Sequence, residues 1–112
     1  MNHNDCWNII NKAEVSTIEW SKEKGNPIFK IEFVATFEDW DNGIGVYIFF
    51  RNDKDKEKSE STGFHIKIKQ YYLHLLEEFT YPFDKFPYVI FIFDSDENVR
   101  RKYEGSYFFR LR

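Results

Sequence analysis

Three oxygen-bearing side chains, Asp94, Asp96 and Asn98, stand at alternate positions, which is the spacing that begins a calcium-binding EF-hand loop. Carboxylate and amide oxygens suit a hard cation of this kind. The rest of the loop pattern is absent, because Val99 stands where the loop needs glycine and Gly105 where it needs a bidentate glutamate. We interpret the segment as a polar turn with helix-capping residues and predict no metal site there.

Histidine chemistry has equally little support. Only His74 has carboxylates at helical ligand spacing, Glu77 and Glu78, and a zinc site needs three or four protein ligands. This spacing is more typical of a solvated surface pair. His65 opposite a carboxylate would form an acid–base pair, but the sequence does not show such proximity.

The motifs of several common enzyme classes are missing. The chain has no glycine-rich phosphate loop, no nucleophile elbow and no serine in a triad-like setting. Cys6 is the single cysteine, which excludes an internal disulfide and a cysteine framework for zinc, and we expect it to be a half-buried apolar residue beside Trp7. We therefore predict a protein that is not an enzyme, with no catalytic residue and no cofactor.

Basic and aromatic residues alternate at 100–103 and 108–112, as they do in proteins that bind single-stranded nucleic acid. The formal net charge of −3 and the pI of about 5.6 argue against that function, since such domains are usually basic. A charged edge strand protected from pairing is the interpretation that we prefer.

Three acidic residues of the N-terminal half lie next to one tryptophan in the sequence. Glu38, Asp39 and Asp41 flank Trp40 at the expected tip of a hairpin. A tryptophan framed by carboxylates can fill a pocket on a basic partner while the charges steer the encounter. Glu38, Asp39, Trp40 and Asp41 are therefore our candidate partner-binding residues, and a solvated turn is the alternative.

Strand patterns dominate the rest of the chain. Apolar and polar residues alternate over 28–38, which predicts a strand with one buried face. Asn42-Gly43 is a strong signal for a two-residue hairpin turn into a second strand at 44–50, apolar on both faces. Segment 86–93 is also apolar on both faces, so we place it centrally in the sheet, with Pro87 at its start.

Helical and irregular segments are fewer. We expect helices near 4–13 and 70–79, a strand at 15–20, and a polar surface loop at 52–61. Residues 63–69 fit either a strand or a helix. A polar connection with one helical turn follows at 94–105, and a last strand closes the chain at 106–112.

Together these patterns predict one α+β domain over residues 1–112, an antiparallel sheet of about five or six strands with one or two helices packed against it. The largely buried positions should be Phe29, Ile31, Phe33, Val46, Ile48, Leu75, Val89, Phe91 and Phe93. No apolar run approaches the roughly 18 residues that span a bilayer, and the N-terminus lacks a secretory signal pattern, so we expect a cytoplasmic protein.

The chain resembles the small acidic immunity proteins of bacterial polymorphic-toxin systems, including contact-dependent inhibition and Maf-type modules. Its size, its lack of catalytic residues, the aromatic strands 29–37 and 88–93, and the acidic segment 38–41 carry the resemblance. It implies a non-catalytic function: the protein binds a cognate toxin domain, often a nuclease, and blocks its substrate site. The alternatives are a small-molecule-binding domain or small enzyme with a cavity between sheet and helices, and a regulatory binding protein.

Overall fold

The computed structural model describes residues 3–111 except 36–42. Helices and strands follow one another along the chain in this order: α1 (His3–Glu23), β1 (Lys30–Ala35), β2 (Gly43–Phe50), α2 (Asp53–Ser61), α3 (Phe64–Glu78), β3 (Tyr88–Ser95), α4 (Asp96–Tyr103) and α5 (Tyr107–Arg110). The protein is α+β, as expected, but helices take up more of it than the sequence patterns indicated.

The described residues form a single mixed sheet of three strands in the order β1-β2-β3. β1 and β2 are antiparallel, with Ala35 opposite Ile44, whereas β2 and β3 are parallel, with Gly43 opposite Tyr88. The predicted antiparallel sheet of five or six strands was therefore wrong. Two helices, α2 and α3, connect β2 to β3 and return the chain to the starting end of β2, and such a crossover produces a parallel pair.

Helix α1 replaces both the short helix expected at 4–13 and the strand expected at 15–20. Its buried residues Cys6, Ile10, Ala13, Thr17 and Ser21 recur every three or four positions, which places them on one helical face. This continuous stripe favours a helix along the whole segment, although the β-branched residues of its second half favour a strand. Cys6 is fully buried rather than half-buried.

Helix α2 occupies the segment expected to be a surface loop. The side chain of Asn52 accepts a hydrogen bond of 2.8 Å from the backbone N–H of Asp55, which caps the first turn. Lys56 and Glu60 form an ion pair of 2.6 Å one turn apart. A cap and a charge pair therefore make a helix from a sequence without an apolar stripe.

Helix α3 settles the ambiguity at 63–69 in favour of a helix and confirms the helix expected from residue 70, which ends at Glu78. The fully or nearly buried residues Phe64, Ile68, Tyr72 and Leu76 lie at helical spacing. They pack with α1 and with one face of the sheet, which forms the main core.

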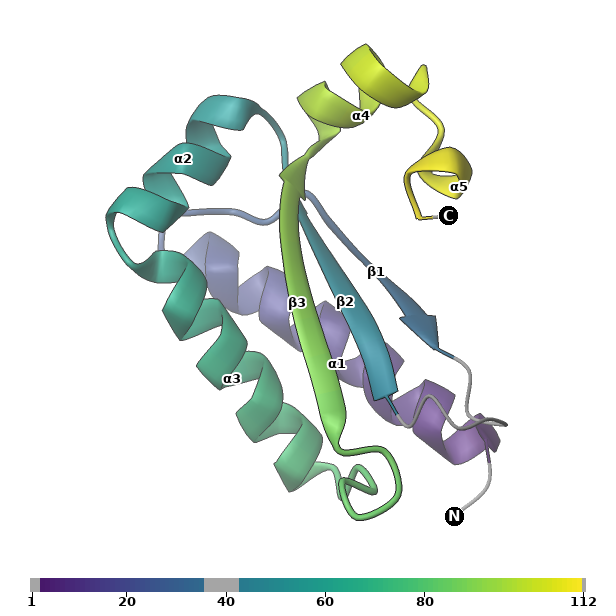
Figure 1. The fold of residues 1–112 in the computed structure, drawn as a ribbon. Coiled ribbons are helices and arrows are strands. Elements are labelled where there is room, and N and C mark those ends of the chain that lie inside the picture. The colour runs from purple at the N-terminus through teal and green to yellow at the C-terminus, as the bar shows by residue number, and fades with distance from the viewer. Residues whose placement is uncertain (1–2, 36–42, 112) are drawn as a thin grey trace.

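Figure 1 shows α1 and α3 together on one side of the sheet, and α4 and α5 near the far end of the strands on the other side. Alternate residues of β2 point to the helix-covered face, where Ile44, Val46 and Ile48 are buried. We call the opposite side the open face. Of the positions predicted to be buried, Ile31, Val46, Ile48 and Leu75 are buried, Phe33, Val89, Phe91 and Phe93 are half-buried, and Phe29 is 37% exposed.

Two predictions about the C-terminal part were wrong. β3 is an edge strand of the described sheet, not a central one. The last strand expected at 106–112 is instead the short helix α5, because the hydroxyl of Ser106 accepts a hydrogen bond of 3.2 Å from the N–H of Phe109 and so caps a helical turn. Within the described residues, no helix has the length and apolar character needed to cross a bilayer.

Candidate functional site

The predicted partner-binding residues Glu38, Asp39, Trp40 and Asp41 lie outside the described residues, as does Asn42 of the predicted turn. Gly43 belongs to strand β2, where it pairs with Tyr88. The acidic segment therefore stays a prediction. The candidate sites that follow consist of described residues.

The oxygen-bearing residues at the end of β3 form a network within the protein. Nε of Arg110 lies 2.6 Å from Oδ2 of Asp94, and the amide of Asn98 donates to both oxygens of the same carboxylate, at 2.9 and 3.1 Å. Arg110 also lies over the rings of Tyr47 and Tyr103. Asp94 is thus occupied by partners from α4 and from α5.

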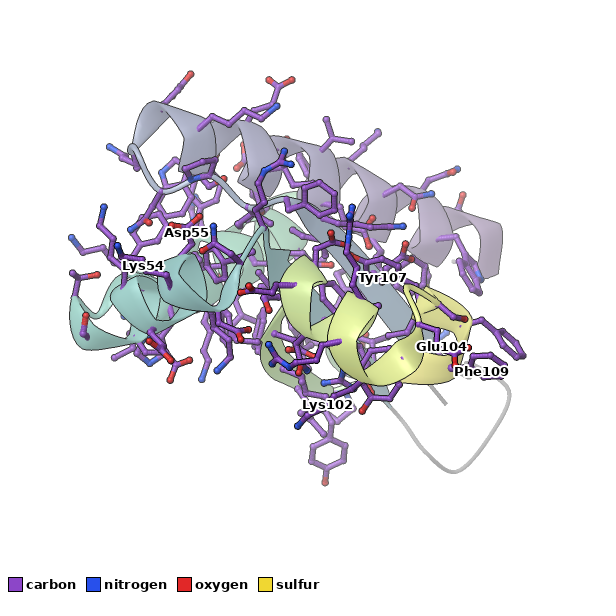
Figure 2. All side chains as sticks on the ribbon, turned by 90° about the horizontal axis from the view of Figure 1, so that it is seen from above. Lys54, Asp55, Lys102, Glu104, Tyr107 and Phe109 are labelled. Atoms are coloured by element: carbon purple, nitrogen blue, oxygen red, sulfur yellow. The ribbon has the colours of Figure 1, made fainter. Side chains whose placement is uncertain are left out.

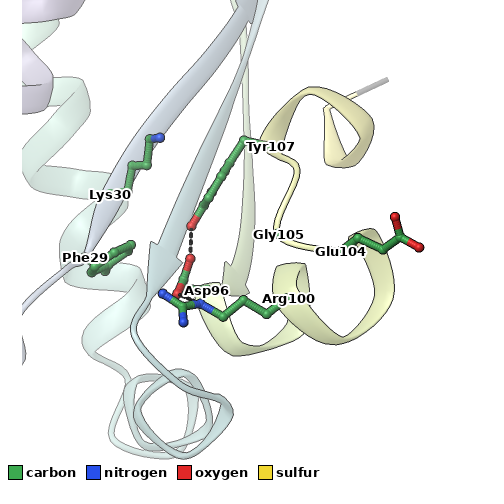
Figure 3. Close-up of a pocket in the computed structure, with 7 residues that line it drawn as sticks. All are labelled: Phe29, Lys30, Asp96, Arg100, Glu104, Gly105 and Tyr107. Carbon is green, nitrogen blue, oxygen red and sulfur yellow. Dashed lines mark hydrogen bonds and ion pairs between the residues drawn. The ribbon is translucent and has the colours of Figure 1, made fainter.

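Asp96 is bridged in the same way (Figure 3). The hydroxyl of Tyr107 donates a hydrogen bond of 2.6 Å to Oδ1, and Nε of Arg100 lies 2.7 Å from Oδ2. Lys30 lies 4.2 Å above the Tyr107 ring. Burial and the bond to Asp96 both raise the pKa of Tyr107 above its usual range, so the phenol keeps its proton and acts as a donor.

A hollow of about 620 Å³ lies beside this network, and Phe29, Lys30, Arg100 and Glu104 contribute to its walls. Glu104 points away from the other labelled side chains in Figure 3. Since both oxygens of Asp96 are already bound by Tyr107 and Arg100, no free base faces the hollow from that residue. The network fastens α4 and α5 to the sheet and provides no acid–base pair.

His65 and His74 have separate contacts and do not share a partner. Nε2 of His74 lies 3.8 Å from a carboxylate oxygen of Glu78 on the exposed side of α3, which confirms the expected surface pair. His65 contacts the backbone carbonyl of Ser59 at 3.2 Å and the ring of Phe93 edge-on. Among the described residues, no group of three or more His, Cys, Asp or Glu side chains is placed to hold a metal ion.

The open face offers a different kind of site. Gly43 and Gly45 point to this face at alternate positions on the central strand, with Val34 beside Gly45 on β1 and with Tyr88 and Ile90 beside the two glycines on β3. A hollow of about 240 Å³ lies at these two glycines. Tyr47 and Ile92 also line it, so its described walls carry no charged group.

The apolar side chains around this hollow are exposed. The exposed fraction is 43% for Val34, 63% for Tyr88 and 60% for Ile90. On the same side of the sheet, α5 adds two more exposed rings, Phe108 and Phe109. Figure 2 shows Tyr107 and Phe109 beside α4, at the opposite end of the view from Lys54 and Asp55 of α2.

Gly43 is fixed by packing. A Cβ atom at this position would lie 2.4 Å from the backbone oxygen of Tyr88 and 2.8 Å from its Cβ, so β2 and β3 could not keep their spacing. At Gly45 an added Cβ would meet Tyr47 at 3.5 Å and the backbone oxygen of Val34 at 4.0 Å, both ordinary contacts. The first glycine is therefore required by strand pairing, whereas the second leaves room that the fold itself does not need.

Comparison of the chain with protein-family models, with curated proteins and with solved structures finds no match to any of them.

The open face is a candidate site that the sequence analysis did not predict. Its signals were the alternating glycines in Gly43-Ile-Gly45-Val and the two apolar faces of segment 88–93. The second signal predicts a central strand, whereas in the structure it marks an edge strand with an exposed apolar face.

Proposed function

We propose that this protein is a non-catalytic binding protein and that another protein docks on its open sheet face. The observation that supports the proposal is the uncharged hollow at Gly43 and Gly45, bordered by the exposed side chains of Val34, Tyr88 and Ile90. Contiguous exposed apolar surface on a small protein is typical of an interaction site.

The shape of the hollow indicates how a partner would bind. An aliphatic or aromatic side chain of the partner enters above the two glycines and contacts the β2 backbone, with Val34 on one side and Ile90 on the other. Anchors of this kind, buried in a pocket near the centre of an interface, supply most of the binding energy. The floor is a paired sheet, so little order has to be gained on binding.

The partner that we propose is a toxin domain, as the resemblance to immunity proteins implies. The net charge of −3 favours a basic partner through long-range attraction. The acidic segment 38–41 directly precedes Asn42 and Gly43 in the sequence and would join the same contact. Covering the substrate site of the toxin would then inhibit it without any chemical step.

The experiment is co-expression of the chain with the product of the gene upstream of its own, followed by size-exclusion chromatography. We expect a stable complex with wild type and loss of that complex with Tyr88→Lys, whose side chain is mostly exposed and can change without disturbing the core. Absence of a complex, or one that is indifferent to this change, would overturn the proposal. Unchanged thermal unfolding of the variant alone is the control for folding.

A further inference from the structure

A second site lies on the other side of the molecule, along the seam between the C-terminal end of α1 and the first three turns of α3. A hollow of about 640 Å³ opens there, within the range of roughly 300–1,000 Å³ that is typical of small-molecule sites. It shares none of its lining residues with the hollow on the open face. The two sites can therefore be tested separately.

One wall of this seam hollow is a stack of three aromatic rings. The ring of Trp20 lies 4.4 Å from that of Tyr71 and 5.2 Å from that of Phe64, at 7° and 9° from parallel. Phe64 and Tyr71 are two turns apart on α3, or about 10.5 Å, so Trp20 lies between them. Both faces of Trp20 are therefore covered, each ring restrains the next, and the stack is a preformed apolar wall that can make edge-to-face contact with a flat ligand.

The polar side of the seam hollow is cationic. Lys24 and Lys67 are the charged residues of its lining, Gln70 and His74 are its other polar side chains, and no carboxylate lines it among the described residues. Within that part of the chain Lys24 and Lys67 form no ion pair, in contrast to Lys30 and Lys56. The whole chain has a net charge of −3, but the two unpaired lysines beside the aromatic wall make this part of its surface positive.

We propose that the seam hollow binds a planar aromatic ligand that carries a phosphate or a similar anionic group. The ring packs against the wall formed by Trp20 and Tyr71, and the anion is held by Lys24 and Lys67. Edge-to-face contact with the stacked rings is favourable for a planar aromatic group, and an ammonium group binds phosphate as a point charge. The seam hollow should therefore prefer ligands that carry both an aromatic ring and an anionic group.

The probe is adenosine 5′-monophosphate, compared with adenosine and with inorganic phosphate. Binding is measured by calorimetry and by quenching of tryptophan fluorescence at low salt. We expect the nucleotide to bind with Kd below about 1 mM, and each of the two fragments at least tenfold more weakly, a difference of about 1.4 kcal/mol. Loss of the quenching in Trp20→Phe would show that the seam hollow is the site.

The charge requirement is tested with Lys24→Gln combined with Lys67→Gln. The matched control is Lys54→Gln combined with Lys102→Gln, which removes the same charge from exposed lysines on α2 and α4. We expect at least a tenfold loss of nucleotide affinity in the first pair and less than a twofold change in the second. Equal losses in both pairs, equal binding of phosphate alone, or no binding of the nucleotide at 5 mM, a limit of roughly 3 kcal/mol on the 1 M scale, would overturn the proposal.

Discussion

Arg110 and Asp94 form a close ion pair in which Nε of the arginine lies 2.6 Å from Oδ2 of the carboxylate. Their side chains are only 18% and 8% exposed. The pair joins α5 to the end of β3. Because α4 and α5 cover that end of the open face, this buried contact also sets the border of the proposed binding surface.

Removing Arg110 should therefore be costly. Arg110→Gln leaves the Asp94 carboxylate buried without its cationic partner, bound only by the Asn98 amide and the N–H of Ser95, and we expect the free energy of unfolding to fall by about 3 kcal/mol. Urea denaturation measures the change. Arg101→Gln is the control, since Arg101 is 53% exposed in its ion pair with Asp53 and should cost less than about 1 kcal/mol. Similar losses in the two variants would show that the Arg110 contact has no special role.

Glu14 should make stability depend on pH. Burial raises the pKa of this carboxyl to about 8, with a smaller contribution from Glu32, and its Oε1 has no hydrogen-bond partner among the described residues. The folded form therefore keeps a proton that the unfolded form, with the ordinary value of 4.5, releases. The contribution to stability is complete below pH 4.5 and is lost as the pH rises through about 8.

The variant Glu14→Gln isolates this effect. It should be more stable than wild type at pH 9 and should lose the decline in stability between pH 4.5 and about 8, the window set by the two pKa values. Glu19→Gln, at an exposed position of the same helix, should keep the decline. Parallel pH profiles for wild type and Glu14→Gln would show that Glu14 is ionised in the folded protein at neutral pH.

The two glycines of the open face should respond differently to alanine. Gly43→Ala places a Cβ 2.4 Å from the backbone of Tyr88, and we expect a loss of about 2 kcal/mol from overpacking. Gly45→Ala makes only ordinary contacts, with Tyr47 at 3.5 Å and the backbone oxygen of Val34 at 4.0 Å, and should raise stability by about 0.5 kcal/mol, because alanine loses less backbone entropy on folding. Thermal unfolding of both variants gives the comparison. A destabilised Gly45→Ala would mean that the fold requires this glycine as well.

Sequence patterns predicted the positions of the three strands better than the number and direction of strands in the sheet. The segments that became β1, β2 and β3 were all recognised, because their alternating or continuous apolar residues are local signals. Their number and direction were not, since these depend on the segments between them. A surface loop at 52–61 and a helix at 70–79 were expected between the segments of β2 and β3, and these local signals did not show that the connection returns the chain to the starting end of β2, which makes the two strands parallel.

Two helix caps explain where the predicted and observed elements differ. Asn52 and Ser106 each accept a hydrogen bond from a backbone N–H three residues on, and each begins a helix where the sequence patterns predict a loop or a strand. The seam hollow was beyond sequence reasoning for another reason: Trp20 and Tyr71 lie on different helices, and only tertiary packing brings their rings to 4.4 Å.

The central claim, that a partner docks on the open face, is tested most directly by the dissociation constant of the toxin-domain complex for two matched variants. Ile90→Lys places a charge on the open face, and Ile66→Lys places the same charge at a comparably exposed position on α3. We predict at least a tenfold weakening for Ile90→Lys, about 1.4 kcal/mol, and less than a twofold change for Ile66→Lys. Equal dissociation constants for the two variants, or a larger loss for Ile66→Lys, would contradict the account.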